Sequence, residues 1–346
     1  MTSSQGGGRR RRSLREGDKP ISCTSCGSCH SQSPRSIQPP LFLGIDGGGT
    51  GTEACLVDAQ GTVLGRGRGG PSNINYVTED VLVKSLATAA RHCLDCGGIS
   101  MNDIAGACLA LAGAGGDNPR RIRHAVSSLF GDRPFIIVED TYSALAAAHG
   151  GRDGIVVIAG TGSNCLGMRD GKYSSAGGYG ALLGDEGSAY SIALKGLRKV
   201  MRAFDGRERP TVLTDLFLKG TGLENPRDFI GLTLEMDRTS IAALSRHVFR
   251  AADDLRDSGA MSILRNEARK LGELVSAVAR GLGLASPEVA ARGGCFQSAT
   301  YFAALQDELA SSFPGAKLFH SARPASEGAA ILARARDWFL KGTGSK

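Results

Sequence analysis

The chain has 346 residues, of which 41% are hydrophobic and 22% are charged. That length suggests two domains, and that composition excludes a chain disordered throughout. No apolar run reaches the roughly 18 residues that a membrane-spanning helix needs, so we expect a soluble protein without a membrane partner.

The formal net charge is +7, and residues 1–38 hold seven Lys/Arg against two acidic residues. The rest of the chain is therefore nearly neutral, and we expect no specific nucleic-acid partner. Six of the nine cysteines are scattered through apolar or glycine-rich sequence. Such a pattern is typical of reduced thiols and indicates a cytoplasmic protein.

Residues 1–38 are rich in Gly, Ser, Arg and Pro and show no periodicity, which predicts a disordered basic tail. Cys23, Cys26, Cys29 and His30 form a CxxCxxCH motif within it. Thiolates at this spacing can hold a metal ion or an iron–sulfur cluster. No second ligand pair follows at a suitable spacing, so we favour a plain tail over a metal site.

The folded part is expected to begin with a three-stranded meander. The apolar run LFLGID predicts a buried strand over 41–46, and a glycine-rich turn follows at 47–52. The next elements are expected to be strands, except where a helix is named: 53–58, 62–67, helix 77–96, 104–112, helix 118–130, 134–139 and helix 141–148. Asn118 is the expected N-cap of the second helix, with Pro119 at its first position.

The same plan then starts again, with an apolar strand at 154–159 and a Gly-Thr-Gly-Ser turn at 160–163. The two turns lie about 114 residues apart, which indicates an internal duplication. The remaining expected elements are strands 164–169 and 172–176, helix 184–202, a mainly helical stretch 210–285, strand 288–292, helix 298–312, strand 317–320 and a closing helix 325–340. Meanders followed by βα units predict an α/β fold with mixed sheets.

Paired glycine turns after apolar strands predict phosphate binding, because glycine lets the backbone approach a ligand and adopt φ > 0. The sequence contains no GxxxxGK[ST] motif, and the turns precede strands rather than a helix, which excludes a dinucleotide fingerprint. The expected phosphate ligands are Gly48, Gly49, Thr50, Thr52, Gly160, Thr161, Gly162 and Ser163. Gly293 and Gly294, late in the chain, are expected to face the adenosine.

This layout resembles the actin/hexokinase/Hsp70 superfamily, which implies duplicated actin-like, ribonuclease H-like lobes with mixed sheets and an interlobe cleft. The segments LFLGIDGGGTGTEACLV, VEDTYSA, IAGTGSNCLG and GGYGALLGDEGSAY resemble the N-acetylglucosamine kinase branch of the BadF/BadG/BcrA/BcrD-type ATPase family. The resemblance covers about residues 41–336. It implies a homodimer that uses ATP and Mg²⁺ to phosphorylate an amino sugar, most simply the 6-hydroxyl of N-acetylglucosamine.

The corresponding domain boundaries follow from the elements above. We expect an N-terminal ATPase lobe over 39–150 and a C-terminal lobe with a helical insertion over 151–325. The closing helix, within 326–346, is expected to return to the first lobe.

Two aspartates carry the expected chemistry. Asp46 ends the first strand beside the glycine turn, where it suits Mg²⁺ held directly or through water. Asp140 directly follows a later apolar strand, where a helix begins, and is the expected general base for the sugar hydroxyl. The alternatives are a strand-end capping role for Asp46 and an N-cap role for Asp140.

The resemblance places the sugar contacts at Asn73, Asp140, Gly178, Tyr179 and Asp185. The alternative role of Asp185 is to cap a helix that begins near Glu186. Tyr179 stands where relatives often carry Trp, so glucosamine and N-acetylmuramic acid remain possible substrates beside N-acetylglucosamine.

Two other functions are compatible with the same fold. One is an ATPase activator of a 2-hydroxyacyl-CoA dehydratase or benzoyl-CoA reductase. Such activators carry an iron–sulfur cluster, for which the CxxCxxCH motif offers cysteine ligands. The segment GGYGALLGDEGS favours the kinase. The other is a non-catalytic sugar sensor, against which the presence of both Asp46 and Asp140 argues.

Overall fold

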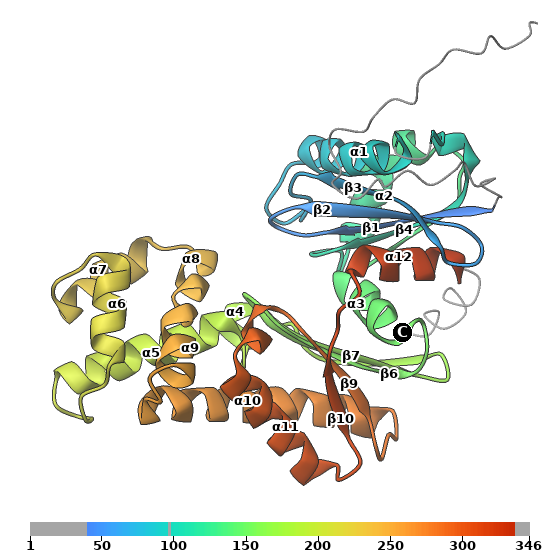
Figure 1. Ribbon diagram of the computed structural model, residues 1–346. Coiled ribbons are helices and arrows are strands. Elements are labelled where there is room, and N and C mark those ends of the chain that lie inside the picture. Colours follow the sequence, from blue (N-terminus) through green and yellow to red (C-terminus); the bar gives the residue numbers. More distant parts are fainter. Residues whose placement is uncertain (1–39, 96–97, 336–346) are drawn as a thin grey trace, which may run out of the picture. The chain divides into compact units, whose positions relative to one another are not determined.

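A computed structural model describes residues 40–95 and 98–335 of the chain (Figure 1). The predicted basic tail, its CxxCxxCH motif and residues 336–340 of the predicted closing helix lie outside the described residues. The first of two five-stranded sheets has the order β3-β2-β1-β4-β5. Its strands are β1 Leu41–Gly47, β2 Thr52–Val57, β3 Val63–Gly69, β4 Ile104–Leu111 and β5 Phe135–Val138.

The second sheet repeats this topology with the order β10-β9-β6-β7-β8. Its strands are β6 Gly154–Ala159, β7 Ser163–Arg169, β8 Lys172–Gly177, β9 Glu288–Arg292 and β10 Lys317–His320. In each sheet the central strand, β1 or β6, pairs antiparallel with the next strand and parallel with a later one. The predicted duplication with mixed sheets is thus confirmed at the level of strand order.

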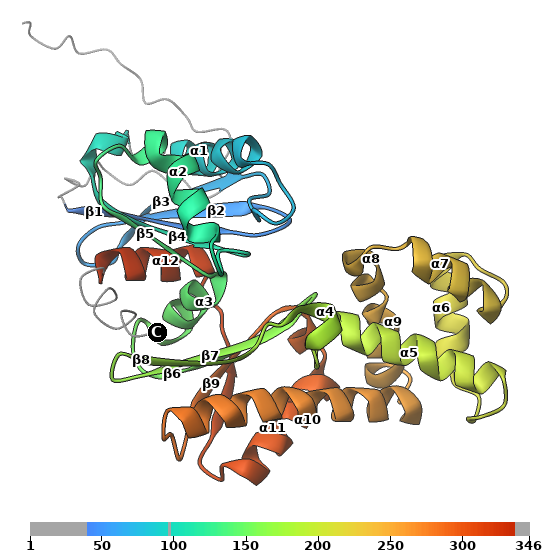
Figure 2. The ribbon, with the colours of Figure 1, turned by 180° about the vertical axis from the view of Figure 1, so that it is seen from behind.

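Two sets of helices cover the first sheet (Figures 1 and 2). Helices α1 Glu79–Asp95 and α2 Asn118–Phe130 bury their apolar sides against one face, where Leu43, Ile45 and Leu109 are fully buried. The closing helix α12 Ala325–Arg334 packs on the other face, against Cys108 and Ala110 of β4. The last helix of the described chain therefore completes the core of the first sheet.

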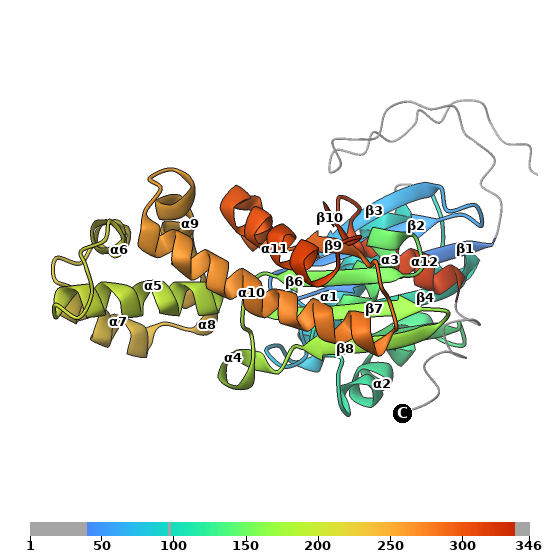
Figure 3. The same cartoon turned by 90° about the horizontal axis from the view of Figure 1, so that it is seen from below.

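The second sheet is covered in the same way. Helices α5 Ala189–Phe204, α10 Ser258–Gly281 and α11 Ala299–Ser312 share a core with one face, and Figure 3 shows α10 running along the sheet. The other face is covered by α3 Asp140–His149, which follows β5 of the first sheet. Each sheet is thus covered on one face by a helix that follows the last strand of the other sheet: α3 follows β5 and covers the second sheet, and α12 follows β10 and covers the first.

The two exchanged helices, α3 and α12, also pack on each other. A side-chain carbon built on Gly328 of α12 would lie 1.9 Å from the carbonyl oxygen of Ser143 in α3. One built on Gly44 of β1 would lie 2.1 Å from the amide nitrogen of Ala330. Glycine at these two positions permits the close approach of β1, α3 and α12.

The insertion between β8 and β9 is helical. It contains α4 Gly180–Leu183, α5, α6 Leu213–Thr221, α7 Phe229–Glu235, α8 Arg238–Ala243, α9 Ser245–Asp253 and α10. Short 3-10 turns lie at Met101–Asp103, Pro226–Asp228 and Gly294–Gln297.

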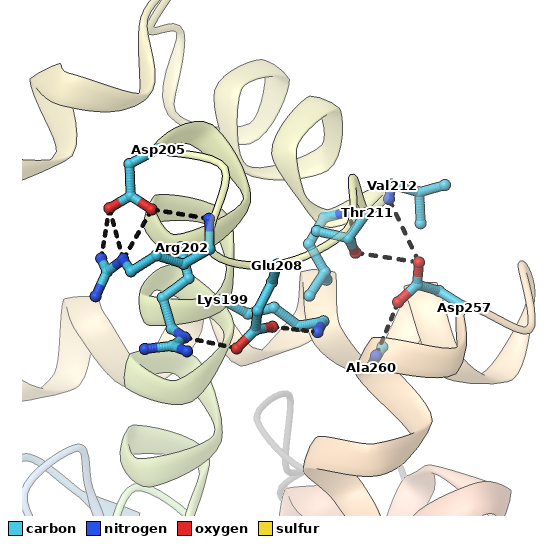
Figure 4. Close-up of polar contacts among 10 residues, drawn as sticks. Lys199, Arg202, Asp205, Glu208, Thr211, Val212, Asp257 and Ala260 are labelled. Carbon is cyan, nitrogen blue, oxygen red and sulfur yellow. Dashed lines mark hydrogen bonds and ion pairs between the residues drawn. The ribbon is translucent and has the colours of Figure 1, made fainter.

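Side-chain contacts hold the connection from α5 to α6 (Figure 4). Glu208 accepts from Lys199 and Arg202 at 2.7 and 2.6 Å, and Asp257 accepts from Thr211 at 3.0 Å.

Two helix starts differ from the sequence prediction. The predicted helix from 184 is wrong at its beginning, because α5 starts at Ala189 and Ser188 caps it by accepting from the amide of Ser191. Asp185 and Gly187 have φ of +60° and +79°, which a right-handed helix cannot contain. Asn118 begins α2 but Asp117, not Asn118, is its N-cap.

No helix within 40–95 and 98–335 is long and apolar enough to cross a membrane.

Candidate active site

The first glycine turn joins β1 to β2. Its one turn-closing backbone bond runs from the amide of Gly48 to the carbonyl of Gly51, at 2.9 Å. The next residues, Gly49 and Thr50, are exposed, and their amides have no partner within the described part of the chain. Adjacent unbonded amides in a glycine turn suit an anion such as a phosphate.

The turn is fixed by the loop that follows β3. The carbonyl of Gly48 accepts from the amide of Ser72 at 2.9 Å. The buried hydroxyl of Thr52, the first residue of β2, lies 2.7 Å from the carbonyl of Gly70 and 2.8 Å from the hydroxyl of Ser72. Thr52, predicted to bind phosphate, is thus buried and holds the loop after β3.

The second turn, between β6 and β7, is one residue shorter but is bonded in a corresponding way. The amide of Gly160 donates to Gly162 at 2.9 Å, and the carbonyl of Gly160 accepts from the amide of Ala189 at 2.8 Å. The hydroxyl of Ser163, the first residue of β7, donates to the carbonyl of Glu186 at 2.6 Å. The duplication therefore extends from strand order to individual hydrogen bonds of the two turns.

Ser163 and Thr161 differ in exposure at the second turn. Ser163 is buried and binds protein groups, as Thr52 does, whereas Thr161 is exposed. A side-chain carbon at Gly162 would lie 2.3 Å from Nη2 of Arg238 and 2.7 Å from Oδ1 of Asp185. The side chains of Arg238 and Asp185 therefore both lie against the second turn.

Asp46 lies at the carboxyl end of β1, directly before the first turn. The hydroxyl of Ser143 in α3 lies 2.8 Å from its Oδ1. Burial raises the pKa of Asp46 to about 6, while the hydrogen bond from Ser143 lowers it and the nearby negative charge of Asp140 raises it. The two predicted functional aspartates are therefore close enough for the charge of Asp140 to raise the pKa of Asp46.

Asp140 is the first residue of α3, and its partly buried carboxylate lies at the carboxyl end of β5. The N-cap is Glu139, which makes no side-chain cap bond. The alternative role of Asp140 as N-cap is therefore wrong. Burial raises the pKa of Asp140, as does the neighbouring charge of Glu139, while its own amide and that of Thr141 lower it. A carboxylate with a raised pKa is a stronger base.

Arg292, which the sequence analysis did not single out, brings a positive charge to both aspartates. It is the last residue of β9, and its charge lowers the pKa of Asp46 and of Asp140. Its guanidinium donates to the carbonyl of Arg323 at 3.0 Å. A residue of the second sheet thus lies within electrostatic reach of carboxylates that end strands of the first sheet.

Gly293 follows Arg292 and lies against the second turn. It has φ of +114°, and a side-chain carbon there would lie 2.2 Å from the carbonyl oxygen of Ala159 and 3.1 Å from the amide nitrogen of Gly160. Gly294 is exposed, and a side-chain carbon there would meet nothing within 4 Å. The glycine pair therefore adjoins the second turn.

Asn73 lies in the loop after β3, at the same edge of the first sheet. Its Oδ1 accepts from the amide of Asn75 at 3.0 Å. Asn75 in turn accepts at 3.0 Å from the side-chain amide of Asn118, which also donates to the carbonyl of Gly113 at 2.7 Å. The loop is therefore tied to the carboxyl end of β4, next to the ends of β1 and β5.

The remaining predicted sugar contacts lie around the second turn. Gly178 donates from its amide to the carbonyl of Ser163 at 3.1 Å, and Tyr179 is 69% exposed. Asp185 is only 3% exposed; its Oδ1 accepts from the amide of Ser163 at 3.1 Å and its Oδ2 is paired with Arg238. Because Ser188 caps α5, the alternative N-cap role of Asp185 is wrong.

No hydrogen bond or ion pair within the described ranges joins Asn73 to Gly178, Tyr179 or Asp185. The structure thus brings together two groups of predicted residues. One surrounds Asp46 and Asp140, and the other surrounds Gly162 and Asp185.

The donor set beside the first turn fits Mg²⁺. Among residues 40–95 and 98–335, no group of three or more His, Cys, Asp or Glu side chains could hold a metal ion. Mg²⁺ usually keeps several waters and binds through one or two carboxylates together with substrate phosphates. Asp46, with Asp140 nearby and a phosphate-binding turn beside it, matches that requirement.

Comparison with known proteins decides the family. The model of the BadF/BadG/BcrA/BcrD ATPase family matches residues 43–333. The chain belongs to this family. An N-acetylmuramic acid/N-acetylglucosamine kinase from Clostridium acetobutylicum is 32% identical over 302 residues, covering 84% of this chain and 97% of that protein. An N-acetyl-D-glucosamine kinase from Dictyostelium discoideum is 30% identical over 311 residues, covering 85% and 97%.

The fold is similar to that of a solved protein structure. A protein from Chromobacterium violaceum, provisionally named an N-acetylglucosamine kinase, superimposes with a TM-score of 0.69 at 25% identity. The superposition covers 84% of this chain and 98% of that one. The predicted resemblance to the N-acetylglucosamine kinase branch, and the duplicated actin-like fold that it implies, are confirmed.

Proposed function

We propose that this chain is an ATP-dependent amino-sugar kinase, which transfers the γ-phosphate of ATP to a sugar hydroxyl. The observation that carries the proposal is the recurrence of a hydrogen-bonded glycine turn after the central strand of each sheet, with Gly48 and Gly160 each donating within the turn and accepting from a later segment. Relatives that match nearly their full length carry the names of N-acetylmuramic acid and N-acetylglucosamine kinases. N-Acetylglucosamine is common to both names, so we propose it as the acceptor, through its 6-hydroxyl.

We further propose that the nucleotide lies in a cleft between lobes formed by 39–150 and 151–325, with α12 belonging to the first lobe. The amides of Gly49 and Thr50, which bind no other described group, would bind one phosphate, and those of Thr161 and Gly162 another. Gly293 and Gly294 would face the adenosine. The swap of α3 and α12 between the sheets supports this arrangement, because it holds the carboxyl ends of β1 and β5 near β9.

Asp46 would hold Mg²⁺ through water, and the ion would neutralise phosphate charge during the transfer. The pKa of Asp46, raised by burial to about 6, still leaves the carboxylate ionised at neutral pH. Ser143 would keep that carboxylate oriented through its 2.8 Å contact.

Asp140 would act as the general base. It would take the proton from the sugar hydroxyl as the sugar oxygen forms its bond to the γ-phosphorus and the bond to the β,γ-bridging oxygen breaks, releasing ADP. Burial raises the pKa of Asp140, which makes it a better proton acceptor. The positive charge of Arg292 opposes that rise.

Asn73, Gly178 and Tyr179 are proposed to contact the sugar. Asp185 can contribute directly, because a carboxylate has roughly four acceptor sites and two protein donors already bind it. Since Asp185 is 3% exposed, its main contribution would come from holding the second turn.

A coupled assay of ADP release tests the proposal. The full chain should release ADP with Mg-ATP and N-acetylglucosamine, and mass spectrometry should show a phosphorylated sugar. N-Acetylmuramic acid and glucosamine, measured in parallel, decide the preferred substrate. ATP hydrolysis that no amino sugar stimulates would instead favour an activator ATPase, and sugar binding without turnover would favour a sensor. Light scattering on the same preparation tests the proposed homodimer.

A further inference from the structure

Arg238 is a charged residue that the chemistry above does not use. It is the first residue of α8, in the helical insertion, and its side chain reaches the turn between β6 and β7. There its Nη2 pairs with Asp185 and would lie 2.3 Å from a side-chain carbon at Gly162. The guanidinium therefore lies against the turn to which a phosphate is proposed to bind.

The guanidinium keeps donors that the protein does not use. Arginine has five N–H donors, and the ion pair with Asp185 engages Nη2. Nε is buried without a hydrogen-bond partner among the described residues. The side chain is nevertheless 37% exposed, so part of it is accessible to a ligand. An arginine with spare donors beside a glycine turn is suited to bind an anionic oxygen.

The orientation of Arg238 is set from both sides. Asp185 is itself fixed, because its Oδ1 accepts from the amide of Ser163 at 3.1 Å. Asp237, which precedes Arg238, caps α8 by accepting from the amide of Ser240 at 2.7 Å. Asp185 thus holds the guanidinium at the turn while α8 fixes the backbone from which it extends.

We propose that Arg238 binds the β-phosphate of the nucleotide at the second glycine turn, with Asp185 positioning it. This inference rests on the proposed function and adds a cation to it. The carboxylate of an acidic sugar offers the same anionic oxygens, but the contact with Gly162 favours the phosphate. In this arrangement the helical insertion takes part in nucleotide binding and does more than enlarge the second lobe.

The test is calorimetric titration of ADP and AMP into the full chain. Arg238→Met should weaken ADP binding by about 10- to 100-fold, the range expected for a hydrogen bond to a charged group. AMP, which lacks the β-phosphate, should bind as it does to the wild type. The ADP affinity of Arg238→Lys should lie between those of the wild type and Arg238→Met. The matched control is Arg227→Met, which removes an exposed arginine from the same insertion and should leave both affinities unchanged.

Arg238→Met leaves Asp185 without its partner and can unfold the turn. The double variant Asp185→Asn/Arg238→Met removes both charges, and Asp185→Asn alone is its reference. If the double variant binds ADP more weakly than Asp185→Asn does, while the two bind AMP equally, the proposal is supported. Equal ADP affinity, or an increase in the KM for N-acetylglucosamine or N-acetylmuramic acid without any loss of ADP affinity, overturns it. A wild type that binds neither nucleotide would overturn the proposed function as well.

Discussion

The hydroxyl of Ser143 lies 2.8 Å from Oδ1 of Asp46, so the first turn of α3 is bonded to the end of β1. Asp140 begins the same turn of α3. The proposed magnesium ligand and the proposed base are therefore fixed to each other through one short helical segment. A small movement of α3 would therefore shift the positions of both carboxylates together.

Replacing Asp140 with Asn keeps the side-chain size and removes the proton acceptor. Turnover should fall by about two to four orders of magnitude, while ADP affinity should hardly change because the turns bind the phosphates. Asp117→Asn is a matched control, since Asp117 also stands at a helix start without a cap bond from its side chain. Turnover by Asp140→Asn at the wild-type rate would exclude Asp140 as the base.

Asp46 should make stability depend on pH. Its pKa is raised by burial to about 6, above the ordinary value of 3.8. Because the unfolded chain loses this proton at lower pH than the folded protein, the wild type loses stability as pH rises from about 4 to about 6. Asp46→Asn, which can still accept from Ser143, should escape that loss. Without Mg²⁺ it should be more stable than the wild type by about 3 kcal/mol at pH 7.5, and by well under about 1 kcal/mol at pH 4.

Urea unfolding of both proteins at several pH values measures this difference. The same variant should lose sugar phosphorylation, because the proposed ligand for Mg²⁺ is gone. A stability difference that stays constant across this pH range would show that Asp46 does not titrate as its burial implies.

Gly48→Ala should separate binding from stability. A side-chain carbon at Gly48 would meet nothing within 4 Å in the protein, so the melting temperature should hold. The added methyl group would occupy space proposed for a phosphate, which should raise the KM for ATP by about 10- to 100-fold. Gly231→Ala, at an equally open position in α7, is the control and should leave the KM unchanged. Similar KM values in the two variants would argue against phosphate binding at the first turn.

Removal of residues 1–38 should leave turnover and melting temperature nearly unchanged. The match to the ATPase family begins at residue 43, and β1 begins at Leu41. Metal analysis of the full chain and the truncated chain completes the experiment. A large loss of turnover together with loss of bound zinc or iron would restore the metal-site hypothesis for the CxxCxxCH motif.

The sequence was informative where structure is local. The strands before both glycine turns are continuous apolar runs, and Asp46 and Asp140 directly follow or end such runs, so their places could be predicted. The start of α5 could not, because it depends on Asp185 adopting φ of +60°, which non-glycine residues rarely do.

Contacts between distant segments were also beyond prediction. Arg292 approaches Asp46 only because two sheets come together, and nothing in its neighbourhood in the sequence marks that approach. Arg238 reaches Asp185 from a helix 53 residues later in the chain. Each arginine has a recognisable sequence context, since Arg292 precedes a glycine pair and Arg238 follows a capping aspartate. Neither pattern is specific enough to predict a contact with the site.

The position of α12 has a consequence for protein synthesis. One face of the first sheet stays uncovered until α12, which begins about 190 residues after the end of β5, has left the ribosome. At about 5–20 residues per second, that delay lasts roughly 10 to 40 seconds. During it, the nascent chain exposes Cys108, Ala110 and Ile136, so chaperones have a defined surface to protect.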